Sequence, residues 1–132
     1  METCTRLRNH YQRLSQPANS VHGEDRASEF LEAAGYRIFE RNWRCREGEL
    51  DIIAYAPERQ ALIGVEVKTR RIGGHVAAYE AVSARKLARL RRLLIIWINE
   101  SGRHAENLAI DLIAISANEA GKSLLEHKEA LL

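Results

Sequence analysis

The chain has 132 residues, of which 45% are hydrophobic and 29% charged, with a formal net charge of +2. This composition predicts one soluble domain with an ordinary core. No apolar run approaches the roughly 20 residues of a membrane-spanning helix, and no secretory signal pattern follows the N-terminal arginines. The charge is too small to identify a nucleic-acid-binding protein by itself. Cys4 and Cys45 lack metal-ligand spacing, which favours reduced thiols and a cytoplasmic location.

Residue patterning divides the chain into three parts. Residues 1–20 are arginine-rich with little apolar periodicity, which predicts a basic arm that either contacts a phosphate backbone or is a solvated terminus. Residues 21–116 hold the strong helix and strand patterns and predict the main domain. Residues 117–132 interleave leucines with charged residues, which predicts a short amphipathic helix packed on the domain or on a partner.

The main domain begins with a predicted helix over residues 21–35. Apolar residues recur there at i, i+3, i+4 and i+7, and Gly35 provides a C-terminal stop. These apolar positions are Ala27, Phe30, Leu31 and Ala34. Glu24 lies one turn earlier on the same stripe. It is a candidate site residue, although an acid in a first helical turn also complements the helix dipole.

Strand patterns follow. Residues 36–45 predict a strand or a pair of strands, and the stretch from Gly48 to Arg70 predicts a hairpin with its loop at 57–60. A glycine-rich loop containing Gly73, Gly74 and His75 comes next. Such a loop could close over a substrate or merely connect two elements.

A long helix and another strand complete the pattern. Ser83 is the predicted N-cap of a helix that reaches about Asn99, with Gly102 beyond its end. Residues 108–115 are β-branched and apolar and predict a strand. Because strand, long helix and strand follow one another, the two strands should pair in parallel. The element order predicts an α/β fold with a mixed sheet flanked by helices.

Charged residues interrupt the apolar strands of the hairpin. Asp51 lies in the first strand, and Glu66 and Lys68 lie in the second. Since side chains alternate along a strand, Glu66 and Lys68 share one face, and the opposite face carries Ile63, Val65 and Val67. Unpaired buried charge is costly. The charged residues therefore either hold a divalent metal or form a structural salt-bridge cluster with Arg70.

The metal interpretation assigns a role to each residue. Hard cations such as Mg²⁺ or Mn²⁺ prefer oxygen ligands, which the carboxylates of Asp51 and Glu66 and the carbonyl of Val67 would supply. Lys68 would orient the attacking water or stabilise charge on the phosphate oxygens. If Glu24 converges on the same place, the four catalytic candidates fit phosphodiester hydrolysis.

The long helix carries a row of basic residues. Arg85, Arg89 and Arg92 share one face, which suits a phosphate backbone but is also typical of a solvated helix surface. The candidate nucleic-acid-binding residues are Arg70, Arg85, Lys86, Arg89 and Arg92.

Five segments together resemble the YraN-type family of uncharacterised bacterial proteins. They are His22–Ala27, Gly35-Tyr36, Arg41–Arg44, Gly48–Ala54 and Val65–Arg70. Lys86 and Asp111 also fit the pattern, and the match covers roughly residues 18–116. Where the related nucleases often carry a proline before the first strand acid, this chain has Leu50.

The resemblance implies a restriction-endonuclease-like fold with an α-β-β-β-α-β core, in the same broad group as archaeal Holliday-junction resolvases. Position by position, Glu24 corresponds to the helix acid, Asp51 and Glu66 to the metal ligands and Lys68 to the catalytic lysine. Resolvases of this fold usually cut two strands as symmetric dimers, so the resemblance also suggests a homodimer.

Three functions compete. The first is a metal-dependent DNA endonuclease, acting on branched or damaged DNA. The second is a non-catalytic DNA-binding or DNA-processing partner protein with the same fold, which holds phosphates through the helix arginines. The third is an interaction protein that docks through residues 117–132. The complete set of two acids and a lysine favours the enzyme.

Overall fold

The computed structural model describes residues 9–14, 20–71, 82–117 and 123–131. In chain order these residues form β1 (Asn9–Leu14), α1 (Ser20–Ala33), β2 (Arg37–Cys45), β3 (Gly48–Ala56), the 3₁₀ turn η1 (Pro57–Arg59), β4 (Ala61–Arg71), α2 (Ala84–Ser101), β5 (Asn107–Ala117) and β6 (Ser123–Lys128). The glycine-rich loop with Gly73, Gly74 and His75 lies outside the described residues.

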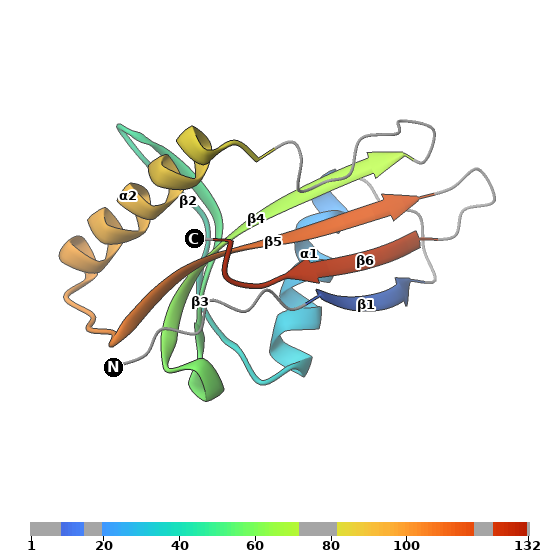
Figure 1. Ribbon diagram of the computed structural model, residues 1–132, viewed down its shortest axis with the longest axis horizontal. Coiled ribbons are helices and arrows are strands. Elements are labelled where there is room, and N and C mark those ends of the chain that lie inside the picture. Colours follow the sequence, from blue (N-terminus) through green and yellow to red (C-terminus); the bar gives the residue numbers. More distant parts are fainter. Residues whose placement is uncertain (1–8, 15–19, 72–81, 118–122, 132) are drawn as a thin grey trace.

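The strands form one six-stranded sheet in the order β1-β6-β5-β4-β3-β2, with α1 and α2 on opposite faces (Figure 1). β4 and β5 pair in parallel, as predicted for strands joined through a long helix, and the other neighbours are antiparallel. The predicted α/β class is confirmed, and the arrangement is consistent with a restriction-endonuclease-like core.

Two elements differ from the sequence-based expectation. The helix predicted within residues 117–132 is wrong, because Ser123–Lys128 form β6 and pair with β5. Part of the expected basic arm, Asn9–Leu14, forms β1 and pairs with β6. Burial along β6 alternates, with Ser123, Leu125 and His127 buried, which is the two-residue period of a strand. Residues 37–45 form a single strand with an irregularity between Ile38 and Glu40.

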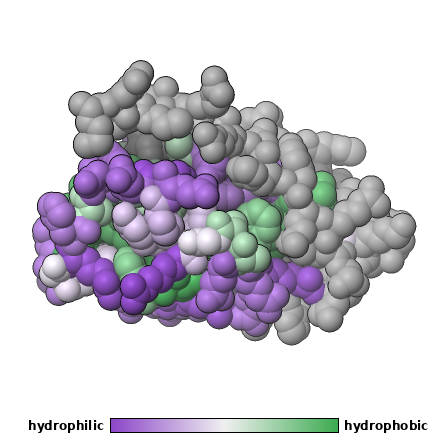
Figure 2. Space-filling model, turned by 90° about the horizontal axis from the view of Figure 1, so that it is seen from below, coloured by the Kyte–Doolittle hydropathy of each residue, from purple (hydrophilic) through white to green (hydrophobic). Residues whose placement is uncertain are grey.

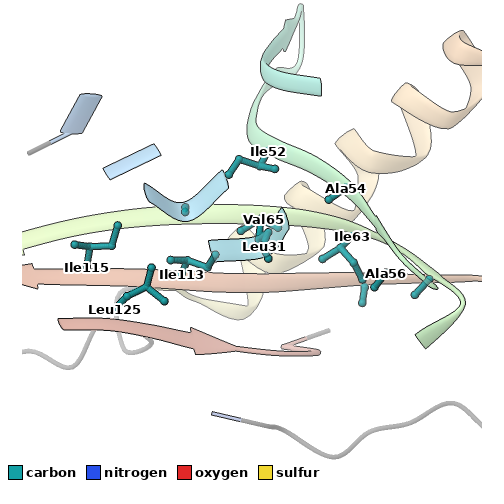
Figure 3. Close-up of a cluster of buried hydrophobic side chains, with 12 residues drawn as sticks. Leu31, Ile52, Ala54, Ala56, Ile63, Val65, Ile113, Ile115 and Leu125 are labelled. Atoms are coloured by element: carbon teal, nitrogen blue, oxygen red, sulfur yellow. The ribbon is translucent and has the colours of Figure 1, made fainter. Parts of the chain in front are cut away.

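The face of the sheet under α1 carries an aliphatic core. Ala27 and Leu31 of α1 are fully buried against Ile52 of β3, Val65 of β4 and Ile113 of β5 (Figure 3). Gly23 brings the start of α1 so close to β4 that a Cβ there would collide with the side chain of Thr69. This close approach places the first turn of α1, which carries Glu24, beside the C-terminal part of β4, beyond the segment that pairs with β3.

The opposite face packs on α2. The buried residues of α2 are Leu90, Leu93, Leu94 and Trp97, and they meet Leu50, Ile53, Leu62 and Ile110 of the sheet. Ser83 is the N-cap, as predicted, because its hydroxyl accepts a hydrogen bond from the backbone N–H of Lys86 at 3.1 Å. Gly102 ends the helix with φ +73°, a conformation that glycine adopts without strain.

Alternation along β4 assigns the charged residues to a face. Ile63 and Val65 belong to the α1 core and Val67 packs against it, whereas Leu62 belongs to the α2 core. Glu66 and Lys68 therefore lie on the α2 face, and the predicted shared face is confirmed.

The surface of the described chain is largely hydrophilic on the side seen in Figure 2, with small hydrophobic areas between the polar ones. Among the described residues, no helix combines the length and the apolar character needed to cross a membrane.

Candidate active site

The candidate site lies where β3 and β4 stop pairing. Their ladder runs from Ala56 opposite Ala61 to Ile52 opposite Val65. One residue beyond this ladder, the backbone N–H of Val67 has a side-chain acceptor instead of a backbone one. It donates a hydrogen bond to Oδ2 of Asp51 at 2.8 Å. The carboxylate thus satisfies a backbone donor that the separating strands leave open.

Asp51 and Glu66 meet at this point. Burial raises the pKa of Asp51 to about 7, and the neighbouring carboxyl group of Glu66 adds to the increase. The hydrogen bond from Val67 works in the opposite direction, while the negative charge of Glu24 on α1 adds to the increase. Of the predicted acids, Asp51 and Glu66 are therefore in contact, and Glu24 acts on them through its charge.

Two lysines face these acids. Lys86, from the first turn of α2, places Nζ 3.1 Å from Oε2 of Glu66. Lys68 lies beside Lys86, and burial and this second ammonium group lower the pKa of Lys68. For Lys86 burial acts against the charged form, but its contacts with Lys68 and Glu66 outweigh burial and raise its pKa. The sequence predicts that Lys86 contacts nucleic acid, whereas in the structure its ammonium group forms an ion pair with Glu66.

The donor set fits a hard divalent cation. Asp51 and Glu66 are neighbouring oxygen donors, and burial together with the nearby acids raises the pKa of Asp51, which favours its protonated form in the absence of a cation. Within the described part of the chain, the ligand oxygens of Glu24, Asp51 and Glu66 do not all come within 4.8 Å of one another. The arrangement therefore offers two protein carboxylates, which is typical of Mg²⁺ sites completed by water and substrate phosphate.

Replacing Asp51 by asparagine is expected to change the pH dependence of stability. The pKa of Asp51 in the folded chain, about 7, lies above the ordinary value of 3.8, so the native state binds a proton more tightly than the unfolded state does. In the wild type this group therefore lowers the free energy of unfolding as pH rises from about 4 to about 7. The Asp51→Asn side chain cannot ionise, so this variant should be more stable than the wild type at pH 8. The full shift corresponds to about 4 kcal/mol, and because Asp51 is only partly buried, solvent screening reduces the expected difference to about 2 kcal/mol.

Urea unfolding of both chains in EDTA, at a series of pH values, measures this difference. At pH 4 the wild-type carboxyl is largely protonated, so the two chains should unfold alike. Equal stability of the two chains at pH 8 would contradict the assignment.

The predicted basic row is exposed. Arg85, Arg89 and Arg92 of α2 are all solvent-accessible, and the guanidinium group of Arg89 lies over Gly48 at the start of β3. Arg70 follows Lys68 on the same face of β4, and its Nε is buried without a hydrogen-bond partner among the described residues. Arg85, Arg89 and Arg92 lie along the first half of α2, where their exposure leaves them open to a phosphate backbone.

A second polar cluster, centred on Asp111, is buried on the α1 face and was missed by sequence reasoning. Asp111 of β5 is fully buried, and its carboxylate accepts hydrogen bonds from both terminal nitrogens of Arg59, at 2.7 and 3.0 Å. His127 Nε2 lies 2.8 Å from its Oδ2, and the N–H of Ala130 donates to its Oδ1 at 2.9 Å. Burial would raise the pKa of Asp111, but the bonds from His127 and Arg59 hold it below its usual value.

Arg59 also connects the remaining members of this Asp111 cluster. It donates to Tyr36 at 2.7 Å and contacts Glu129 at 3.2 Å, and the Tyr36 hydroxyl donates to Glu129 at 2.9 Å. The ligand atoms of Asp111, His127 and Glu129 are close enough for a metal ion. The guanidinium of Arg59 already bridges both carboxylates, so this cluster is an internal ion network.

A six-stranded mixed sheet between two helices, with two carboxyl groups and two lysines where β3 and β4 separate, fits the restriction-endonuclease-like class. The chain belongs to the uncharacterised protein family UPF0102, whose model matches residues 23–115. The YraN-type resemblance of the sequence is thereby confirmed.

Relatives described as UPF0102 proteins span most of the chain. The protein of Beutenbergia cavernae is 42% identical over 113 residues, covering 86% of this chain and 94% of its own. That of Rhodococcus jostii is 43% identical over 110 residues, covering 83% and 92%. That of Pelobacter propionicus is 40% identical over 105 residues, covering 80% and 75%. These descriptions name a family and state no activity.

Proposed function

We propose that this protein is a divalent-metal-dependent DNA endonuclease that hydrolyses phosphodiester bonds in branched or damaged DNA. The observation that carries the proposal is the contact between the Asp51 and Glu66 carboxyl groups, with Lys68 and Lys86 beside them. Lys86 pairs with Glu66, but Asp51 is held by a backbone N–H and not by a base, so the two neighbouring acids leave room for a further positive charge.

In this proposal each residue has a distinct role. Asp51 and Glu66 hold Mg²⁺ or Mn²⁺, which supplies an activated water and neutralises charge on the phosphate. The backbone carbonyl of Val67 is a third proposed ligand. The backbone N–H of the same residue donates a hydrogen bond to Asp51 and fixes the orientation of its carboxylate. Lys68 stabilises negative charge on the reacting phosphate, and Glu24 adds negative potential that favours cation binding.

The DNA would lie against the first half of α2. Arg85, Arg89 and Arg92 are exposed there, and guanidinium groups bind phosphate through charge-assisted hydrogen bonds. Such contacts position a duplex without reading its sequence, which fits a substrate that is defined by its branched shape. A cytoplasmic location and a homodimer that cuts two strands are parts of the same proposal.

A cleavage panel tests this proposal. The purified chain is incubated with Mg²⁺ or Mn²⁺ and end-labelled single-stranded, duplex, flap and four-way-junction DNA. We expect metal-dependent cleavage of at least one branched substrate, loss of cleavage in EDTA, and none with Asp51→Asn. Salt-sensitive DNA binding without cleavage under any metal would favour the non-catalytic partner protein instead.

A further inference from the structure

The contact between Lys86 and Glu66 has a consequence for the proposed metal site. Lys86 Nζ lies 3.1 Å from Glu66 Oε2, and the side chain of Glu66 is only 14% exposed. An ammonium group at this distance occupies the side of the carboxylate to which a cation would bind. In the described structure Lys86 therefore supplies positive charge to the same oxygens that the proposed function assigns to a divalent cation.

Lys86 is better placed to leave than Lys68. Its side chain is 35% exposed and extends from the first turn of α2, where Ser83 fixes its backbone N–H. Lys68 belongs to the same strand as Glu66, in the middle of the parallel β4–β5 ladder. Two ammonium groups that already adjoin repel each other and would repel a bound cation more strongly. Because Lys86 extends from a different element than Glu66, its side chain can withdraw without disturbing the strand that carries Glu66 and Lys68.

We propose that Lys86 is an exchangeable counter-ion: it neutralises Glu66 in the metal-free protein, leaves when a divalent cation binds, and then contacts a DNA phosphate. This inference rests on the proposed function. It makes Lys86 a positioning residue that links metal binding to DNA binding. In the metal-free protein Lys86 is the ion-pair partner of Glu66. In the metal-bound protein the ammonium group of Lys86 becomes available on the surface that faces the DNA.

The direct test measures metal binding without DNA. Mn²⁺ titration followed by electron paramagnetic resonance compares the wild type with Lys86→Met and with Arg85→Met. Arg85 is the preceding, exposed residue, so its variant loses the same charge without touching Glu66. Lys86→Met should bind Mn²⁺ about tenfold more tightly than the wild type, because one competing charge is gone. Arg85→Met should stay within about twofold, since an exposed charge is well screened.

The second test measures DNA binding. With Ca²⁺ as the metal and a four-way junction as the probe, the slope of log K against log salt concentration should steepen by about 0.9 in the wild type, because one more phosphate is neutralised. Lys86→Met should show a smaller metal-induced change than Arg103→Met, which removes an exposed charge beyond the C-terminal end of α2, outside the proposed DNA-binding row. Circular dichroism checks that each variant is folded, and Lys86→Gln replaces Lys86→Met if that variant is not.

The outcomes separate this inference from the proposed function. Equal or weaker Mn²⁺ binding by Lys86→Met would show that Lys86 does not compete for Glu66, and would leave the metal site intact. If neither the wild type nor the variant binds Mn²⁺, the metal site and the role of Lys86 both fail. Tighter Mn²⁺ binding with an unchanged salt slope would overturn the phosphate contact.

Discussion

Replacing Arg59 by methionine is expected to lower the free energy of unfolding by about 3–5 kcal/mol. Asp111 is fully buried and Arg59 gives it two hydrogen bonds. Methionine fills similar space but leaves a buried carboxylate with less compensation, which is among the costliest changes in a protein interior. Urea unfolding at pH 7, followed by circular dichroism, measures the loss.

The same variant should also unfold at higher pH during acid titration. The pKa of Asp111 is lowered in the folded chain, so this group contributes stability above its unfolded pKa and loses it as pH falls through the folded value. Without Arg59 the folded pKa rises and the acid transition moves upward.

Two further variants show whether the cause is the unpaired charge. Arg46→Met removes an exposed arginine from the turn between β2 and β3 and should change stability by less than about 0.5 kcal/mol. The double variant Arg59→Met/Asp111→Leu removes both charges and should recover part of the loss, since a buried ion pair is often replaceable by apolar groups. A loss below about 1 kcal/mol in Arg59→Met would mean that the Asp111 cluster does not hold the fold together.

Replacing Lys68 by methionine is expected to reduce cleavage about a hundred- to a thousandfold while DNA affinity changes by less than about threefold. The reason is that a positioned charge next to the reacting phosphate acts mainly in the transition state. Lys68 contributes one of several cations around the site, so the ground-state loss is small. Single-turnover cleavage and DNA binding in Ca²⁺ separate the two effects.

Arg103→Met is the matched control for this prediction. Arg103 follows the C-terminal end of α2, where its guanidinium lies 3.9 Å above the ring of Phe39. Lys86 marks the other end of the same 18-residue helix, so the two ends are about 25 Å apart. The control loses one positive charge far from the chemistry and should cleave within about twofold of the wild type. Equal rates for Lys68→Met and the control would refute the role of Lys68.

Local patterns were enough to predict the hairpin, both helices and the parallel strand pair. Leu90, Leu94 and Trp97 recur at helical spacing and are buried, and Ser83 was recognised as a cap from its position alone. Glu66 and Lys68 could be assigned to one face because strand alternation needs no tertiary information. The contact between Asp51 and Glu66 followed once the two strands were paired as a hairpin.

Distant partners could not be predicted in this way. β1 pairs with β6 across more than one hundred residues, and its residues Asn9–Leu14 are mostly polar. His127 is buried in β6. An apolar residue at this position would have continued the alternation of apolar and polar residues that indicates a strand. Asp111 gave the available signal, since an acid in the apolar run 108–115 needs a partner. The sequence did not indicate that the partner is Arg59, in a turn fifty-two positions earlier.

The ion network and the candidate site occupy adjacent rungs of one ladder. Val65 is aligned with Asp111 and Glu66 with Leu112, so the two polar centres point to opposite sides of the same strand pair. A slip of β5 by one residue would turn Asp111 away from Arg59 and push Leu112 into the place of an ion pair. A shifted pairing of β4 and β5 would therefore lose the Arg59–Asp111 ion pair, which makes that register less stable than the observed one. Through that penalty, a purely internal contact sets the strand alignment on which the site across the sheet depends.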